Sequence, residues 1–264
     1  RITREYDQRY GIRGEHLNSI ARINFDNARD NARAQTRQWQ FPEGAFSCDD
    51  ELNPVIEGRV RKQDCGQITD GAACVILAGA AAAREHAERL GIKLADIPRI
   101  KGWGHRSAPL LLEQKLSLSA GKPLIFPHAS ATMSDAIRRA GFTHITDLDG
   151  LETHDCFSVT ELVTMEDLHI SQPGKGWRDV LDGFYDADGK IPCQIDGGLK
   201  CFGHPIGASG LRMLYEAWLQ LRGEAPEDRR IATLGERDLA LTHNLGGYPG
   251  EMVSFVSIVG THPG

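Results

Sequence analysis

One glycine-rich run constrains the fold of this chain more than any other feature. Residues 197–210 read GGLKCFGHPIGASG, a glycine turn followed by a His-Pro pair and a Gly/Ser-rich helix entry. The glycines let the backbone approach a ligand closely, and Pro205 limits where the imidazole of His204 can point. The helix start beyond it offers free N–H groups to a developing negative charge. We therefore expect this loop to present His204 to a ligand; the alternative is a plain strand-to-helix turn with a surface histidine.

Apolar periodicity in the rest of the chain alternates between helix-like and strand-like segments. Helical patterns cover residues 1–40, 80–90, 130–140, 158–168 and 211–221. Short apolar or β-branched runs predict strands at residues 72–77, 100–104, 145–151 and 252–259. Residues 41–63 read as irregular and residues 171–190 as turns. Strands that alternate with helices predict an α/β fold.

Local signals add detail to several of these helices. Gly91 and Gly141 stand where glycine commonly ends a helix. Ser158 followed by Glu161 is a capping-box signal. The last helix is predicted to be amphipathic because four apolar residues fall on one stripe: Leu211, Leu214, Tyr215 and Trp218.

Composition fits an ordinary globular protein, with 41% hydrophobic and 25% charged residues. The net charge of −6 argues against general nucleic-acid binding, and no apolar run approaches the length of a membrane span. The six cysteines are scattered without a CxxC pair, so we expect no zinc or other metal site. Scattered thiols in a chain of this size favour a reducing, cytoplasmic compartment.

Three further segments, taken with the His-Pro run, resemble the thiolases, acyl transferases that use coenzyme A. Residues 152–157, ETHDCF, resemble the HDCF variant of the usual NEAF loop, a variant found in the sterol-carrier-protein type of thiolase. Residues 243–250, HNLGGYPG, stand where most thiolases, acetyl-CoA acetyltransferases among them, carry a CxGG motif with a catalytic cysteine. Residues 64–77, DCGQITDGAACVIL, are similar to the family's NASGxxDGAAxxxL segment. The resemblance covers roughly the whole chain and is strongest from Asp64 onward.

The resemblance implies a thiolase-like, layered αβαβα fold, of which this chain would hold the complete C-terminal half at residues 97–264. Residues 64–96 would be the end of the N-terminal half, and residues 1–63 part of the loop region that covers CoA. Thiolases carry a nucleophilic cysteine in their first half, and no cysteine here stands in such a context. We therefore expect the chain to be the C-terminal two thirds of a thiolase, with the nucleophile supplied by an N-terminal segment.

The resemblance also implies roles for three reactive side chains. His204 would help to activate the nucleophilic cysteine and donate a hydrogen bond to the thioester oxygen, since an imidazole titrates near neutrality. His154 occupies the Asn position of NEAF and would position a water at the enolate oxyanion hole. Cys156 would be the acid/base, because Asn244 stands in the usual cysteine position and an amide transfers no protons. A thiol among glycine amides and histidine could have a lowered pKa; the alternative is a small buried hydrophobe.

Backbone and pocket residues complete the expected site. The N–H of Gly246 would form a second oxyanion hole, and Gly66 and Gly247 would contact CoA. Tyr248 replaces a usual glycine and could narrow the acyl pocket. Next to the reactive residues, Asp155 is expected to be a helix N-cap and not a catalyst, and Phe157 to pack in the core or form a pocket wall.

Three functions fit these observations. The first is thiolase-type acyl transfer, either thiolytic cleavage of a 3-oxoacyl-CoA or Claisen condensation, in lipid metabolism. The second, motivated by Tyr248 and the absent CxG cysteine, is a retro-aldolase acting on a sterol side-chain CoA ester with a small partner protein. The third is a non-catalytic CoA-binding or scaffold subunit. The expected partners are acyl-CoA, the N-terminal thiolase segment and further copies of the chain in a dimer or tetramer.

Overall fold

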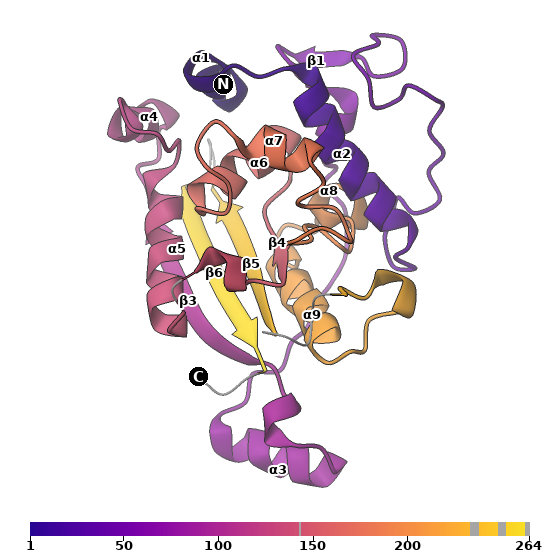
Figure 1. Ribbon diagram of the computed structural model, residues 1–264, viewed down its shortest axis with the longest axis vertical. Coiled ribbons are helices and arrows are strands. Elements are labelled where there is room, and N and C mark those ends of the chain that lie inside the picture. The colour runs from indigo at the N-terminus through magenta and orange to yellow at the C-terminus, as the bar shows by residue number, and fades with distance from the viewer. Residues whose placement is uncertain (143, 233–237, 248–251, 262–264) are drawn as a thin grey trace.

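A mixed β-sheet forms the centre of the molecule (Figure 1). The computed structural model describes residues 1–142, 144–232, 238–247 and 252–261. Within them the sheet has the order β3-β6-β5-β4, in which β4 pairs parallel to β5 and the other pairs are antiparallel. Its strands are β3 Arg99–Ser107, β4 Gly150–Glu152, β5 Leu239–Gly246 and β6 Val253–Gly260.

Helix α5, Pro127–Ala140, covers one face of the sheet. It lies directly on β3, because a Cβ at Gly102 or Gly104 would collide with the carbonyl oxygens of Ala136 and Thr132. The helix ends at Gly141 in the left-handed conformation, at φ 79°, as its sequence predicts. Helix α9, Ser209–Leu221, covers β5 and β4 on the other face. The predicted class, a thiolase-like α/β fold, is confirmed as a mixed sheet between helices.

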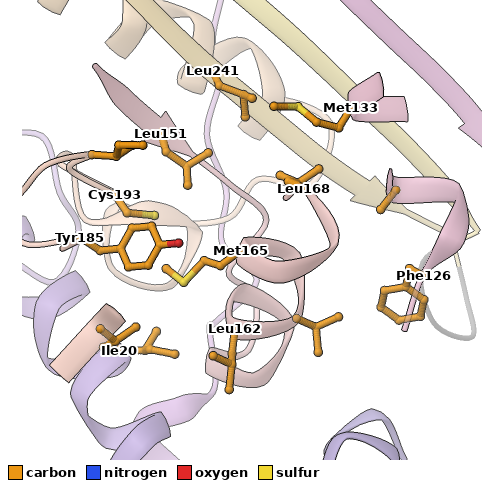
Figure 2. Packing of buried hydrophobic residues seen from close by; sticks show 14 of the residues in the cluster. Ile20, Phe126, Met133, Leu151, Leu162, Met165, Leu168, Tyr185, Cys193 and Leu241 are labelled. Carbon is orange, nitrogen blue, oxygen red and sulfur yellow. The ribbon is translucent and has the colours of Figure 1, made fainter. Parts of the chain in front are cut away.

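The main hydrophobic core lies around helix α6, Ser158–Asp167, whose residues are all buried. Figure 2 shows Leu162 of this helix near Ile20 of α2 and Met165 near Tyr185, while Leu168, just after the helix, lies on the side of Met133. The remaining helices are α1 Ile2–Tyr10, α2 Gly14–Arg29, α3 Ala80–Leu90, α4 Leu112–Ser119, α7 Gly176–Leu181 and α8 Gly198–Phe202. The short elements are β1 Val55–Glu57, β2 Val60–Arg61 and the 3₁₀ turns η1 Lys62–Asp64, η2 Leu94–Asp96, η3 Ile145–Asp147 and η4 Glu227–Arg229.

Four local predictions differ from the structure. The helical N-terminus divides at Gly11, which has φ 72°, and ends at Arg29. The strand predicted at 145–151 begins as a 3₁₀ turn and pairs only at Gly150–Glu152. Ser158 is the first residue of α6 and not its cap, and Glu161 instead accepts a hydrogen bond from a side chain of α2. Strand β5 was not predicted, because Thr242, His243 and Asn244 interrupt its run of apolar residues.

Residues 72–77 form no strand, so that prediction is wrong. Within the described residues this run pairs with no neighbouring strand, and its apolar side chains stand exposed, Ile76 at 91% and Leu77 at 73%. A single extended run cannot bury its apolar side chains or satisfy its backbone without a neighbour. The run leads into α3, which projects from the rest of the fold in Figure 1. Helix α3 itself is confirmed, with Gly91 ending it at φ 67°.

Helix α9 is amphipathic as predicted, but its buried face combines the apolar Met213 and Ala217 with polar residues. An apolar stripe normally faces the core. Here Leu211 is exposed and the rest of the apolar stripe is half-buried, while Arg212, Glu216 and Gln220 are buried. The polar face is stable inside because it is paired: Arg212 bridges to Glu152 and Asp196, and Glu216 to Arg229.

In the described part of the chain, no helix has the length and apolar character that crossing a bilayer needs.

Candidate functional site

Three segments that are distant in sequence meet at one place. The HDCF loop follows β4, and the GHP loop follows the short helix α8. Residues 65–69 run between them: the Gly66 N–H donates to the Cys156 carbonyl at 2.8 Å, and Ile68 forms a bridge with His204. The His204 N–H donates to the Thr69 hydroxyl at 2.9 Å. The imidazoles of His154 and His204 then lie edge to face, with ring centroids 5.4 Å apart.

Gly66 is required by the packing of this junction. A Cβ there would come within 3.0 Å of the Cys156 carbonyl oxygen and 3.4 Å of the Lys200 Cα. Larger residues would push the HDCF loop and α8 away from the segment between them. Gly66 thus has a structural role in the site, and contact of Gly66 with CoA stays a prediction.

Asp155, in the HDCF loop, binds the short helix α8 that leads into the GHP loop. Its carboxylate is fully buried and accepts hydrogen bonds from the N–H groups of Leu199, at 2.6 Å, and Lys200, at 3.2 Å. The amide of Asn24, on α2, donates to it at 3.0 Å. Asp155 acts as a helix cap, as expected, but its carboxylate binds N–H groups in the first turn of α8 and not those of α6.

Two buried glutamates and one buried lysine lie next to the loops: Glu152, Glu161 and Lys200. Burial, together with the charge of the neighbouring Asp155, raises the pKa of Glu161 to about 8. Burial likewise raises the pKa of Glu152 to about 8, against the opposing field of Arg212. The buried ammonium of Lys200 donates to the Ser158 hydroxyl at 2.7 Å. Burial thus favours the protonated form of both glutamates, while Arg212 beside Glu152 and Lys200 near Glu161 favour the ionised form.

The two imidazoles are neutral for the same reason. Burial lowers the pKa of His154 to about 3, with a further contribution from His204. Burial also lowers the pKa of His204, while the Asp155 carboxylate opposes that shift. His204 Nδ1 lies 2.7 Å from the Ser209 hydroxyl, and His154 Nδ1 has no hydrogen-bond partner among the described residues. Neutral imidazoles at this position can each donate one hydrogen bond and accept another.

Of the two cysteines here, Cys156 is half-buried in the HDCF loop. The thiol of Cys65 points elsewhere, toward the Arg61 carbonyl at 3.4 Å, and burial raises the pKa of that thiol. Cys65 is therefore a poor nucleophile. Phe157 is 43% exposed, so the expectation that it packs in the core is wrong, while a place in a pocket wall stays open.

The HNLGG segment forms the end of β5 beside the GHP loop. Asn244 lies against Gly210, since a Cβ on that glycine would be 3.2 Å from the Asn244 amide nitrogen. Gly246 and Gly247 are exposed at the strand end, and Gly247 has φ 89°. The roles of Gly246 in an oxyanion hole and of Gly247 in CoA binding stay predictions. Tyr248 lies outside the described residues.

Sequence reasoning missed several residues that hold the site. Asn24 and Lys200 act across long sequence separations, and no local pattern indicates them. Ser209 and Thr69 lie inside the quoted motifs, so their hydroxyls could have been singled out there. His243, expected to be structural, is fully buried, and its ring nitrogens face the hydroxyls of Thr153 and Ser254. The described residues contain no group of three or more His, Cys, Asp or Glu able to hold a metal ion.

Fold and site together define a protein of the thiolase type, and comparison with known families agrees. The profile of the family described as thiolase C-terminal domain-like matches residues 112–260, and the chain belongs to this family. The chain is 32% identical over 252 residues to an acetyl-CoA acetyltransferase of Methanothermobacter thermautotrophicus, covering 94% of this chain and 59% of that one. It is 30% identical over 244 residues to human sterol carrier protein 2, covering 92% of this chain and 41% of that protein. The chain thus spans less than two thirds of these relatives.

Solved structures show the same fold. A complex titled Ltp2-ChsH2(DUF35) aldolase superposes with a TM-score of 0.72 at 19% identity, over 98% of this chain and 61% of that one. A monomeric SCP2-thiolase-like protein of Mycobacterium smegmatis superposes with a TM-score of 0.66 at 16% identity, over 100% of this chain and 51% of that one. At such identities the likeness concerns the fold alone.

Proposed function

We propose that this chain supplies the acid/base and oxyanion-hole side of a thiolase-type acyl-transfer site. The reaction is thiolytic cleavage of a 3-oxoacyl-CoA or the reverse Claisen condensation. One observation carries the proposal: His154, Cys156 and His204 converge on residues 65–69, with both imidazoles kept neutral by burial. Proton abstraction beside a thioester needs a base and hydrogen-bond donors for the enolate oxygen, and this cluster holds both types of group.

Each residue has a definite part in this scheme. Cys156 takes the proton from the carbon beside the thioester, since Asn244 in the alternative position cannot. The unpaired Nδ1 of His154 holds a water that donates to the enolate oxygen. His204 faces both the nucleophile and the thioester oxygen. The N–H of Gly246 stabilises the tetrahedral intermediate.

The nucleophilic cysteine comes from another polypeptide segment, which also completes the CoA site. Exposed apolar side chains support a large missing contact: Ile76 and Leu77 on the unpaired run, Leu211 on α9, and Phe255 on β6. Phe255 pairs with Asn244 across the sheet, and Asn244 contacts the first turn of α9, so this face is continuous. In this proposal residues 1–63 belong to the CoA-covering region, 64–96 to the first half and 97–264 to the second, and the complete enzyme is a homodimer or homotetramer.

A retro-aldolase is the second candidate. Asn244 in place of a catalytic cysteine favours it, as does the aldolase complex among the structures of the same fold. The presence of both histidines and Cys156 in one cluster favours thiolysis instead. A non-catalytic scaffold is the third candidate, and the same experiment separates all three.

The test begins with denaturing intact-mass analysis of the protein purified from its source, followed by assays of thiolysis and of retro-aldol cleavage. We expect an accompanying segment with a reactive cysteine, and thiolysis that Cys156→Ser lowers by about 10²-fold or more. Cys48→Ser, which changes an exposed thiol outside the three segments, is the control. Retro-aldol cleavage without thiolysis would favour the second candidate. A single 29.0 kDa species that catalyses neither reaction would overturn the enzyme reading.

A further inference from the structure

We propose that the Ser209 hydroxyl is a two-position hydrogen-bond partner that lets His204 carry its proton on either ring nitrogen. Its catalytic meaning rests on the proposed function, but the hydrogen-bond arrangement itself does not. Ser209 is the first residue of α9 and is 2% exposed, so no bulk water competes for its hydroxyl. It is a positioning residue, because it acts on the reaction only through the imidazole.

The Ser209 oxygen has two partners and only one proton to give. It lies 2.7 Å from His204 Nδ1 and 3.1 Å from the Pro205 carbonyl oxygen. When the hydroxyl donates to Nδ1, the imidazole proton must be on Nε2. When the hydroxyl turns to the Pro205 carbonyl, its oxygen accepts from Nδ1–H, and Nε2 keeps a free lone pair.

The surroundings do not fix one of these positions. The Pro205 carbonyl already accepts from the N–H groups of Ala208, at 2.8 Å, and Ser209, at 3.0 Å. A carbonyl oxygen has two lone pairs, so it does not require the hydroxyl. The contact of 2.7 Å between the hydroxyl and Nδ1 is present in both positions and selects neither. The charged or titratable groups facing the ring are His154 and Asp155. Thr69 bonds the His204 backbone and leaves the ring free.

The two positions match the two tasks that His204 has in acyl transfer. With Nε2 unprotonated, the ring accepts the proton of the nucleophilic thiol: the S–H bond breaks, an N–H bond forms on Nε2, and the imidazolium still donates from Nδ1 to Ser209. With Nε2 protonated in the neutral ring, the same nitrogen donates to the thioester oxygen. The Ser209 hydroxyl can therefore hydrogen-bond His204 both when the ring acts as a base and when it acts as a donor.

Nitrogen-15 NMR of the imidazole side chains tests this on the chain itself, without any activity assay. We expect both ring nitrogens of wild-type His204 to show shifts between the limits of the two neutral tautomers. In Ser209→Ala the ring should shift to the Nε2–H form, because a buried N–H without an acceptor costs more than an unpaired lone pair. Its pKa should fall by about one unit or more, since the imidazolium loses a charge-assisted hydrogen bond. Ser209→Thr keeps the hydroxyl and should restore the wild-type pattern.

Ser254→Ala is the matched control, because it removes a buried hydroxyl from another buried histidine, His243. It should change the His243 signals and leave those of His204 in place. A wild-type His204 held in one neutral tautomer would overturn the proposal, and that measurement needs no variant to fold. If His204 shows both tautomers but the protein is inactive when combined with its complementary segment, the hydrogen-bond arrangement is correct. That result would contradict the proposed function instead.

Discussion

The Asp155 carboxylate accepts the backbone N–H of Leu199 at 2.6 Å, and this bond joins the HDCF loop to the helix that leads into the GHP loop. Because Asp155 lies between His154 and Cys156 in sequence, the bond also fixes the direction in which those two side chains leave the backbone. Asn24 of α2 adds a third chain segment to the same carboxylate. The relative position of the reactive groups thus depends on a residue that touches no substrate.

Replacing Asp155 by alanine should therefore destabilise the whole protein. The change removes hydrogen bonds to a buried charged acceptor and leaves the N–H groups of Leu199 and Lys200 without partners, at a cost of about 3 kcal/mol. Urea unfolding measures the loss. Asp26→Ala, which removes an exposed carboxylate paired only with Arg29, is the control and should leave the midpoint nearly unchanged. Equal midpoints for both variants would show that Asp155 does not hold the loops.

The contribution of Glu161 to stability should fall as pH rises from about 4.5 to about 8, because the buried Glu161 keeps its proton while the unfolded chain loses it. The unfolded state then binds fewer protons than the folded state, so the free energy of unfolding decreases by about 1.4 kcal/mol per pH unit for each such group. Below the unfolded pKa the contribution is fully present. Glu161→Gln should flatten this dependence in urea titrations across that range. If Glu161→Gln leaves the pH dependence unchanged, Lys200 keeps Glu161 ionised in the folded protein.

A methyl group at Gly104 should separate α5 from the sheet. The added Cβ would meet the Thr132 carbonyl, which belongs to a helix backbone and cannot move aside, so Gly104→Ala should cost about 3 kcal/mol. Gly79→Ala is the control, since nothing lies within 4 Å of a Cβ there. Thermal unfolding of the two variants should differ by several degrees, and indistinguishable curves would contradict the close contact of α5 with β3.

The exposed apolar face should bind the nucleophile-carrying segment. Phe255→Ser and Leu211→Ser each remove apolar area from that contact and should weaken reconstitution at least about tenfold. Neither should destabilise the chain alone, because both side chains are more than a third exposed, at 38% and 37%. Leu118→Ser, on α4 and 52% exposed, is the control. If all three variants reconstitute equally well, the segment binds elsewhere.

The resemblance to thiolases predicts that the three motifs belong to one site, and the structure brings them together at residues 66–69. The sequence does not predict the contact of Asn24 with Asp155, 131 positions away, or the pair of Arg212 with Glu152, 60 positions apart. Such pairs explain why the buried face of α9 could not be inferred from the helix alone. Its apolar stripe is visible locally, whereas the acids that stabilise Arg212 inside the fold lie on other segments.

Main-chain hydrogen bonds contribute to the spacing of the HDCF and GHP loops, beside the side-chain bonds of Asp155. Residues 66–69 bind the HDCF loop through the Cys156 carbonyl and the GHP loop through the His204 backbone. The side chains at positions 154, 156 and 204 take no part in these bonds, so they can be exchanged without altering the frame that carries them. The backbone bonds set where the loops lie, and the side chains set what they can react with. A protein that keeps these bonds can therefore acquire a new reaction by exchanging a few side chains, while the distance between the loops stays the same.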